Sequence, residues 1–273
     1  MALLEQHTMN DSQVFSPPPI LIVEEEPALR NALIQLLSEE GYAPSGVASL
    51  DEAWETVDQR SFSLILADLL VGKSPHSFTS AHLLRRHAPL IPMGILTDQA
   101  VSLWERQWNA FAFTLPKPLE TTRLLVEVAA CLHLPLSREQ MRQEEVVRRL
   151  LEAIAARGWS RLLSLCTEDV RYYPSEPFPG FTAGPLQGAK ALEAFTSSIW
   201  QDAPRLRLEV GNIYSRPRGL ALRYLCYAPT ADDGWAWQES AALFQFVGDR
   251  ICQIGFPDLD QPQPRSHQIP QVG

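Results

Sequence analysis

Cysteine is scarce in this sequence, and the few cysteines are not arranged for chemistry. Only four occur in 273 residues, widely scattered, with no CxxC pair and no histidine at the spacing of a metal ligand. This pattern argues against a zinc site and a disulfide framework, and it fits a reducing cytoplasm. We interpret the four as small core residues: Cys131, Cys166, Cys226 and Cys252.

Basic runs and long apolar runs are also missing. The formal net charge is −9 and lysine and arginine form no run, so binding of nucleic acid through a basic surface is not expected. No apolar stretch approaches the roughly 20 residues of a membrane-spanning helix. Residues 1–13 lack the basic segment and apolar core of a signal peptide. We therefore expect a cytoplasmic protein with no membrane partner and no direct nucleic-acid partner.

The chain is long enough for two domains that each bury a core of their own. Residues 1–18 lead into a run of three prolines at positions 17–19, and residues 259–273 are rich in glutamine and proline, so we expect a disordered lead-in at 1–18 and a disordered tail at 259–273. Helix-breaking residues at 133–139 predict a linker between a first domain at 19–132 and a second domain at 140–258.

The first domain is organised around residues 62–68, a short apolar run closed by the carboxylate of Asp68. Such a run is typical of a strand buried on both faces of a parallel sheet. Ligands of these sheets bind beyond the carboxyl ends of the strands, which makes Asp68 a candidate site residue. The alternative is that Asp68 only caps the strand or begins a turn.

Strands and helices alternate through this half of the chain. Helical patterns follow or separate five short apolar runs, and the last helix is expected at 121–132. This alternation predicts an α/β domain with a doubly wound parallel sheet of five strands. The strands are expected at residues 20–23, 42–48, 62–68, 92–97 and 111–115.

The strand ends of this sheet carry a coherent set of polar residues. Three carboxylates in one crevice repel one another unless a hard cation lies between them. A hydroxyl and a mobile ammonium are both suited to an anion held on Asp68. The set fits a metal-assisted carboxylate nucleophile that takes a phosphoryl group, and it comprises Glu24, Glu25, Asp68, Thr97 and Lys117.

On these residues the first half resembles the receiver domain of two-component response regulators. The matching pieces are residues 20–27, Asp68, Thr97 and the Lys117-Pro118 step, and the resemblance covers about residues 19–132. It implies that Asp68 accepts phosphate from a sensor histidine kinase or a phosphotransfer protein. It also implies that Thr97 and Lys117 bind the phosphoryl oxygens and that the last helices shift in response. Mg²⁺ would be held by Glu24, Glu25 and Asp68.

Several positions depart from the family pattern. Glu25 stands where the family usually has aspartate, and the extra methylene can displace the ion from near-octahedral geometry. Asp98 places a negative charge directly after the hydroxyl residue, where the family has a small residue. Thr114 replaces the usual aromatic residue, and the loop after Asp68 lacks the usual Met-Pro. Because of these departures, an alternative interpretation remains, in which the domain is a pseudo-receiver that takes no phosphate and serves as an interaction module.

The second half begins with helical patterns and ends with strand patterns. Residues 137–140 have the spacing of a capping box, and the helix that follows carries an apolar stripe that we interpret as core. Two further helices are expected at 160–166 and 189–200. The apolar residues then recur at every second position, and strands are expected at 205–210, 220–227, 235–246 and 250–256. Helices followed by an antiparallel meander predict an α+β domain.

This half resembles the NTF2-like superfamily in its SnoaL-like branch, which includes polyketide cyclases and relatives of ketosteroid isomerase. The resemblance covers about residues 140–258. It implies a cone-shaped domain whose curved sheet and helices enclose an apolar pocket. It rests on Gly158-Trp159, Leu163, residues 167–170 and 186–188, Leu192, Phe195 and residues 248–251.

Enzymes of this shape need a carboxylate or histidine base beside a hydrogen-bond donor. No histidine lies between His133 and His267, so the candidate bases are Asp169, Glu176 and Glu239. Core packing is the alternative for the aromatic residues, and solvation or pairing with arginine is the alternative for the carboxylates. The donors that we consider are Tyr172, Tyr214, Tyr224 and Trp237, and the predicted pocket set is Tyr172, Tyr224, Trp237 and Glu239.

These expectations describe a cytoplasmic response regulator whose phosphorylation at Asp68 switches an NTF2-like domain. That domain would bind a small apolar ligand or contact partner proteins, and a homodimer through its open sheet face is a further hypothesis. The first alternative is an enzyme in which the receiver controls an isomerase-like or cyclase-like pocket. The second alternative is the pseudo-receiver scaffold.

Overall fold

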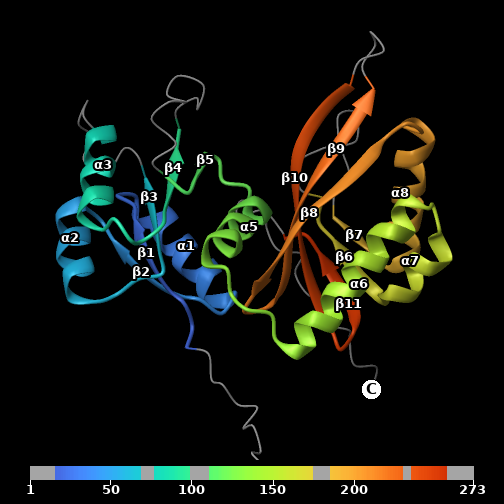
Figure 1. Ribbon diagram of the computed structural model, residues 1–273, viewed down its shortest axis with the longest axis horizontal. Helices are drawn as coiled ribbons and strands as arrows, with labels where there is room; N and C mark the ends of the chain where they lie inside the picture. The colour runs from blue at the N-terminus through green and yellow to red at the C-terminus, as the bar shows by residue number, and fades with distance from the viewer. Residues whose placement is uncertain (1–15, 69–76, 99–110, 175–184, 230–234, 257–273) are drawn as a thin grey trace, which may run out of the picture.

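The apolar run that ends in Asp68 forms β3 (Leu64–Asp68), the middle strand of a five-stranded sheet. The computed structural model describes residues 16–68, 77–98, 111–174, 185–229 and 235–256. Its N-terminal and C-terminal halves each contain one sheet with helices packed against it, and they lie next to each other along the long axis of the molecule (Figure 1).

The N-terminal sheet is parallel throughout and has the strand order β2-β1-β3-β4-β5. Helices α1 and α5 bury their apolar residues on one face, and α2 and α3 cover the other face. This arrangement confirms the predicted doubly wound sheet. The remaining elements are β1 (Pro19–Val23), α1 (Pro27–Glu39), β2 (Ala43–Val47), α2 (Leu50–Gln59), α3 (Ser77–His87), β4 (Met93–Thr97), β5 (Phe113–Pro116) and α5 (Thr121–Leu132).

Local signals in the sequence fix several ends of these helices. Pro27 occupies the first turn of α1, and Gly41 takes a φ of +88° just beyond its end. The hydroxyl of Ser49 accepts a hydrogen bond of 3.2 Å from the backbone N–H of Glu52 and caps α2. The helix predicted near 103–108 and most of the loop after Asp68 lie outside the described residues.

The C-terminal half is an α+β domain with a six-stranded sheet of order β7-β6-β11-β10-β9-β8. Strands β8 to β11 form the predicted antiparallel meander, and β6 joins β11 in parallel. The stripe of α6 belongs to the core of this domain, as predicted. The elements are α6 (Arg138–Ala155), α7 (Trp159–Leu165), β6 (Cys166–Tyr172), β7 (Leu186–Gln187), α8 (Ala189–Asp202), β8 (Arg207–Arg216), β9 (Gly219–Pro229), β10 (Trp235–Val247) and β11 (Arg250–Ile254).

Helix α5 lies between the two sheets and belongs to both cores (Figure 1). Its apolar residues pack inward on the N-terminal sheet and outward on the C-terminal sheet, in one continuous cluster with Ala221, Ala241 and Leu243. The short connection to α6 is fixed as well, because Leu134 forms a β-bridge with Ser215. The two halves are therefore packed together and not merely tethered.

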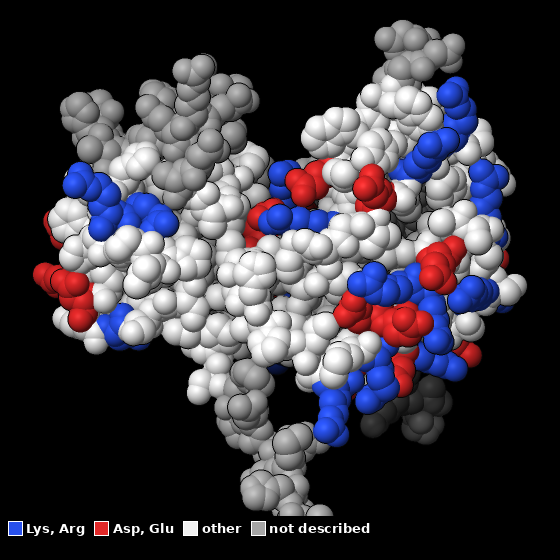
Figure 2. All heavy atoms as spheres, in the orientation of Figure 1, with Lys and Arg blue, Asp and Glu red and all other residues white. Residues whose placement is uncertain are grey.

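Polar contacts cross the same boundary at three levels. Arg216 on β8 pairs with Glu40 at the end of α1. Arg223 on β9 pairs with Glu127 of α5. The hydroxyl of Thr122 accepts a hydrogen bond of 3.1 Å from the backbone N–H of Phe256, just after β11. Figure 2 shows acidic and basic side chains next to one another in the hollow between the halves, where Glu127, Arg223 and other charged residues line a small cleft.

All four cysteines are free, and Cys166 and Cys226 are buried as expected of core residues. Within the part of the chain that the structure describes, every helix is too short or too polar to cross a membrane.

Candidate functional sites

The carboxyl ends of β1, β3 and β5 bring Glu24, Asp68 and Lys117 together, as the order of the strands requires. The ammonium group of Lys117 lies 2.9 Å from Oε2 of Glu24 and 3.2 Å from Oδ2 of Asp68. Glu24 is only 1% exposed, and its other carboxylate oxygen accepts a hydrogen bond from the backbone N–H of Glu26. One cation thus holds two nearly buried carboxylates at the edge of the sheet.

Burial lowers the pKa of Lys117, but the hydrogen bond that its ammonium donates to Glu24 and the charges of Asp68 and Glu24 outweigh this effect, so the net pKa is raised. Lys117 therefore stays protonated at neutral pH. Its backbone N–H donates to the carbonyl of Thr97 at 2.8 Å, which ties the end of β5 to the end of β4. Thr97 is fully buried, and Asp98, the next residue, is exposed.

The donor set of this site can be tested against a divalent cation. Mg²⁺ prefers carboxylate oxygens, so the two carboxylates of Glu24 and Asp68 fit the ion chemically. Glu25 is exposed, and Arg30 donates to the backbone carbonyls of both Glu24 and Glu25. No three acidic, histidine or cysteine side chains among the described residues gather closely enough to hold a metal ion. The part of Glu25 in metal binding therefore stays a prediction.

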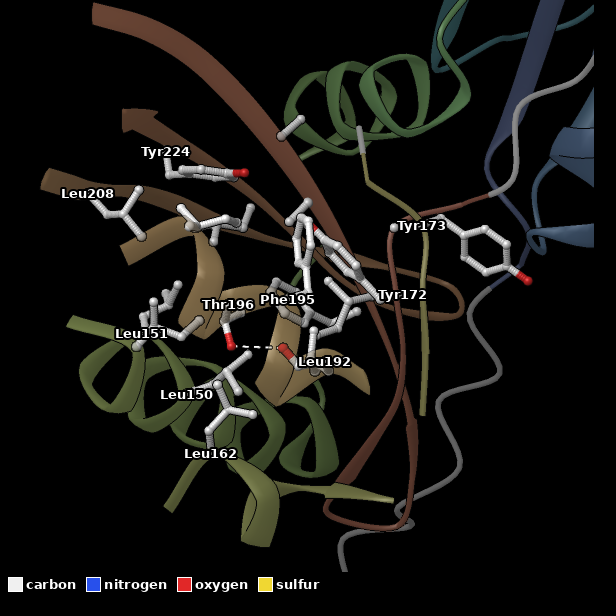
Figure 3. A pocket seen from close by; sticks show the side chains of 18 of the residues that line it. Leu150, Leu151, Leu162, Tyr172, Tyr173, Leu192, Phe195, Thr196, Leu208 and Tyr224 are labelled. Atoms are coloured by element: carbon white, nitrogen blue, oxygen red, sulfur yellow. Dashed lines mark hydrogen bonds between the residues drawn. The ribbon is translucent and has the colours of Figure 1, made fainter. Parts of the chain in front are cut away.

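The C-terminal domain encloses an apolar cavity of about 120 Å³ between its helices and the inner face of its sheet (Figure 3). Leucine side chains of α6 and α7 close one side, and Tyr172 of β6 and Tyr224 of β9 bring hydroxyl groups to the lining. Thr196 also lines it, but its hydroxyl donates to the carbonyl of Leu192 in its own helix. The other described residues of the lining are apolar except Gly255 and Tyr173, and Tyr173 points away from the cavity in Figure 3.

The hydroxyl groups of this cavity are neutral. Burial raises the pKa of Tyr172 to about 12. Burial also raises the pKa of Tyr224, against which a hydrogen bond with Ser240 has a smaller effect. The ring of Tyr172 packs on Phe195 with a centroid distance of 5.4 Å. Both tyrosines therefore offer hydrogen-bonding groups without charge at physiological pH.

Comparison with protein families assigns each half. Residues 20–129 match the response regulator receiver domain, and residues 147–254 match the SnoaL-like domain. The chain joins a receiver domain to a SnoaL-like domain. No curated protein matches it. The receiver match includes the positions of Glu24, Asp68, Thr97 and Lys117, and the SnoaL-like match includes most of the cavity lining.

Three solved structures that resemble the chain each cover one of its two domains. The non-phosphorylated HemR receiver domain of Leptospira biflexa is 23% identical, covers 44% of this chain and 98% of its own, and has a TM-score of 0.39. The response regulator TrrA of Thermotoga maritima, in complex with Mg²⁺ and BeF, is 21% identical. It covers 42% of this chain and 98% of its own, with a TM-score of 0.38. A structure described as a putative SnoaL-like polyketide cyclase of Jannaschia sp. CCS1 is 16% identical. It covers 44% of this chain and 88% of its own, with a TM-score of 0.37.

Two residues of the predicted pocket set are not in the cavity of the SnoaL-like domain. Trp237 and Glu239 alternate onto the outer face of β10, opposite to Ala242 and Phe244, which line the cavity. Trp237 is 67% exposed, and Glu239 lines the cleft beside α5. Their shared face was predicted correctly, but our expectation that it forms the pocket wall was wrong.

The remaining candidates are dispersed. Asp169 is exposed on β6, and Tyr214 packs against the cluster around α5 on the outer face of the sheet. Glu176 lies outside the described residues. Among the described lining residues none carries a carboxylate or an imidazole, so the candidate bases that the structure places do not meet the tyrosine hydroxyls.

Sequence reasoning missed the charged residues between the domains. The pairs Glu40–Arg216 and Glu127–Arg223 join residues 176 and 96 positions apart. A glutamate on an otherwise apolar helix face is a weak signal, and Glu127 of α5 is such a residue. Its arginine partner on a distant strand has no local pattern that identifies it.

Proposed function

We propose that this chain is a response regulator in which Asp68 accepts a phosphoryl group from a histidine kinase or a phosphotransfer protein. The observation that carries the proposal is the contact of Lys117 with both Glu24 and Asp68. An oxygen of the Asp68 carboxylate attacks phosphorus, and the phosphorus–nitrogen bond of the donor phosphohistidine breaks. The imidazole nitrogen leaves with the electron pair and takes up a proton.

Lys117 and Thr97 can stabilise the negative charge of the phosphoryl group on Asp68. Lys117 can turn from Glu24 toward a phosphoryl oxygen, because its ammonium already lies within 3.2 Å of Asp68. Thr97 lies at the end of the neighbouring strand, with its hydroxyl as a further donor. Glu24 and Asp68, with Glu25 as the predicted third ligand, would hold a Mg²⁺ ion, which would neutralise phosphoryl charge when bound.

The response would travel through α5. Only Pro118 and Leu119 separate Lys117 from Glu120, which caps α5 by accepting hydrogen bonds from the backbone N–H groups of Thr122 and Arg123 at 2.9 and 2.7 Å. A movement of Lys117 toward a phosphoryl group would therefore displace the first turn of α5, the helix that packs on the SnoaL-like sheet. This supports a switch that acts on the docking of the second domain.

For the SnoaL-like domain we propose binding of a small apolar molecule in its cavity. The apolar lining with two neutral tyrosine hydroxyls supports binding. The alternative of an enzyme needs a base, and neither Asp169 nor Glu239 lines the cavity. A homodimer would have to use the outer face of the sheet, where α5 already covers Ala221, Ala241 and Leu243. Trp235 and Trp237 are 42% and 67% exposed on this face, so a second copy could pack against them.

The test is intact mass spectrometry of the full chain after incubation with acetyl phosphate and Mg²⁺. We expect a phosphoryl-sized gain in the native chain and none in Asp68→Ala or in the isosteric Asp68→Asn. A folded native chain that gains no mass contradicts the proposal and favours the pseudo-receiver. In that case Asp98→Ala and Glu25→Asp, alone and together, show whether the departures from the family pattern close the site.

A further inference from the structure

The receiver helix and the SnoaL-like cavity lie on opposite faces of the same strands. On β9, Ala221 and Arg223 contact α5, whereas Leu222 and Tyr224 line the cavity. Strand β10 repeats this alternation over residues 241–244. The sheet is a single layer, so only the backbone of these two strands separates α5 from the interior of the cavity.

Two places bring the cavity and α5 closer than a sheet normally allows. Ala241 lines the cavity and also the cleft that Glu120, Glu127 and Arg223 form under α5, because its side chain is too small to fill the layer. At the end of β11, Gly255 lines the cavity, and the next residue, Phe256, donates its backbone N–H to Thr122 of α5. The cavity wall is therefore bonded to the first turn of the helix.

The same turn follows the phosphoacceptor site directly. Glu120 and Thr122 lie three and five residues after Lys117, which bridges Glu24 and Asp68. A chain of contacts thus runs from Asp68 through Lys117 and the start of α5 to Phe256 and Gly255. Protein interiors are close-packed, so a shift of α5 has to move the strands on which it packs or open a gap.

We propose that occupancy of the SnoaL-like cavity by a neutral, apolar molecule and phosphorylation of Asp68 are energetically coupled through α5, β9 and β10. The inference rests on the proposed function, because it takes Asp68 as the phosphoacceptor. We expect the ligand to be neutral because no described residue of the cavity lining carries a charge that could pair with an ionised ligand. Coupling of this kind is reciprocal, so each event changes the affinity for the other by one common factor.

The experiment uses the full chain, with indole as a neutral aromatic probe and beryllofluoride with Mg²⁺ as a stable substitute for the phosphoryl group. The dissociation constant of indole is measured by NMR titration with and without beryllofluoride, and fluorine NMR reports independently whether beryllofluoride is bound. We expect the indole constant to change by about 5-fold or more, in the range typical of allosteric coupling. In Asp68→Ala the constant should not depend on beryllofluoride.

Neighbouring threonines supply a matched pair of variants. Thr121 and Thr122 are both fully buried in the first turn of α5, but only the Thr122 hydroxyl accepts the Phe256 N–H, whereas the Thr121 hydroxyl has no hydrogen-bond partner among the described residues. Thr122→Val should reduce the beryllofluoride effect on indole affinity, and Thr121→Val should retain it. A purely structural role of the turn would affect both variants alike.

The outcomes separate the inference from the proposed function. If beryllofluoride and indole both bind but neither changes the affinity for the other, the coupling is overturned and the response regulator stands. The same holds if beryllofluoride binds and indole, benzene and naphthalene all fail to bind. If beryllofluoride does not bind and acetyl phosphate adds no mass, the proposed function fails and the coupling falls with it.

Discussion

Arg216 and Glu40 form an ion pair that is buried across the boundary between the receiver domain and the SnoaL-like domain. The two side chains are 0% and 2% exposed. Arg216 also donates to the backbone carbonyl of Arg218 at 2.7 Å. The pair joins the end of α1 to the hairpin between β8 and β9, next to Gly41, where an added Cβ would collide with the side chain of Pro217. It fixes the relative position of the domains at the end of α5 that is remote from Asp68.

We expect Arg216→Met to destabilise the protein by about 3–5 kcal/mol, because it leaves the Glu40 carboxylate buried without a counter-charge. The double variant Arg216→Met with Glu40→Leu should recover much of this loss. Urea unfolding followed by tryptophan fluorescence measures both. As a control, Arg149→Met breaks the exposed pair with Glu145, which should cost no more than about 0.5 kcal/mol. Equal losses in the two single variants would contradict the importance of burial.

Lys117 should stabilise the folded protein in a pH-dependent way. Its pKa is raised above the ordinary 10.5 by Glu24 and Asp68, in spite of burial. A raised pKa means that its contribution is fully present below pH 10.5 and is lost as the pH rises through the folded-state pKa. The difference in unfolding free energy between the native chain and Lys117→Met should be constant from pH 7 to 9 and shrink above that window. A constant difference at all pH values would refute this assignment.

Local patterns predicted most of the elements, and the structure shows where they cease to do so. Helix α5 was predicted with its observed bounds because its apolar period and flanking residues are local. Strand β8 was predicted to end near Val210, but it continues to Arg216 through an irregularity between Val210 and Ile213. At that irregularity the side chains that lie on the cavity side of the sheet change from even to odd positions, so a single alternating pattern of apolar residues no longer runs along the whole strand.

The site was predictable where parallel strands determine it and not where the domains meet. The order of the strands alone brings Glu24, Asp68 and Lys117 to one edge. On β10 the sequence shows that Trp237 and Glu239 share a face, but both faces of this strand contact apolar residues. One face packs on α5 and the other lines the cavity. Which face lies inward depends on the docking of the receiver, which no local pattern contains.

Glu127 provides a test of the electrostatics beneath α5. Burial raises its pKa above the ordinary value, Glu239 adds to this effect, and Arg223 opposes it. We therefore expect Glu239→Gln to lower the pKa of Glu127 and Arg223→Met to raise it further. Carbon-detected NMR titration of the Glu127 carboxyl measures both shifts. Because the pKa is raised, Glu127 favours the folded state most at acidic pH, and this contribution is lost as the pH rises through the folded-state pKa.

Filling the cavity should abolish ligand binding without unfolding the domain. Ala242 lines the cavity from β10, and leucine at this position extends into a space of about 120 Å³. We expect Ala242→Leu to weaken indole binding at least tenfold, while the unfolding free energy falls by no more than about 1–3 kcal/mol, the usual cost of an added core side chain.

Ala236→Leu is the matched control for this variant. Ala236 lies on the same face of the same strand, but it is exposed and does not line the cavity. Indole affinity should therefore be unchanged in Ala236→Leu, and its stability should stay within about 0.5 kcal/mol of the native value, as for most surface substitutions. Equal indole affinity in Ala242→Leu and the native chain would show that the probe binds elsewhere. Such a result would contradict the assignment of indole to this cavity, because a bound molecule cannot occupy the volume that the leucine side chain takes.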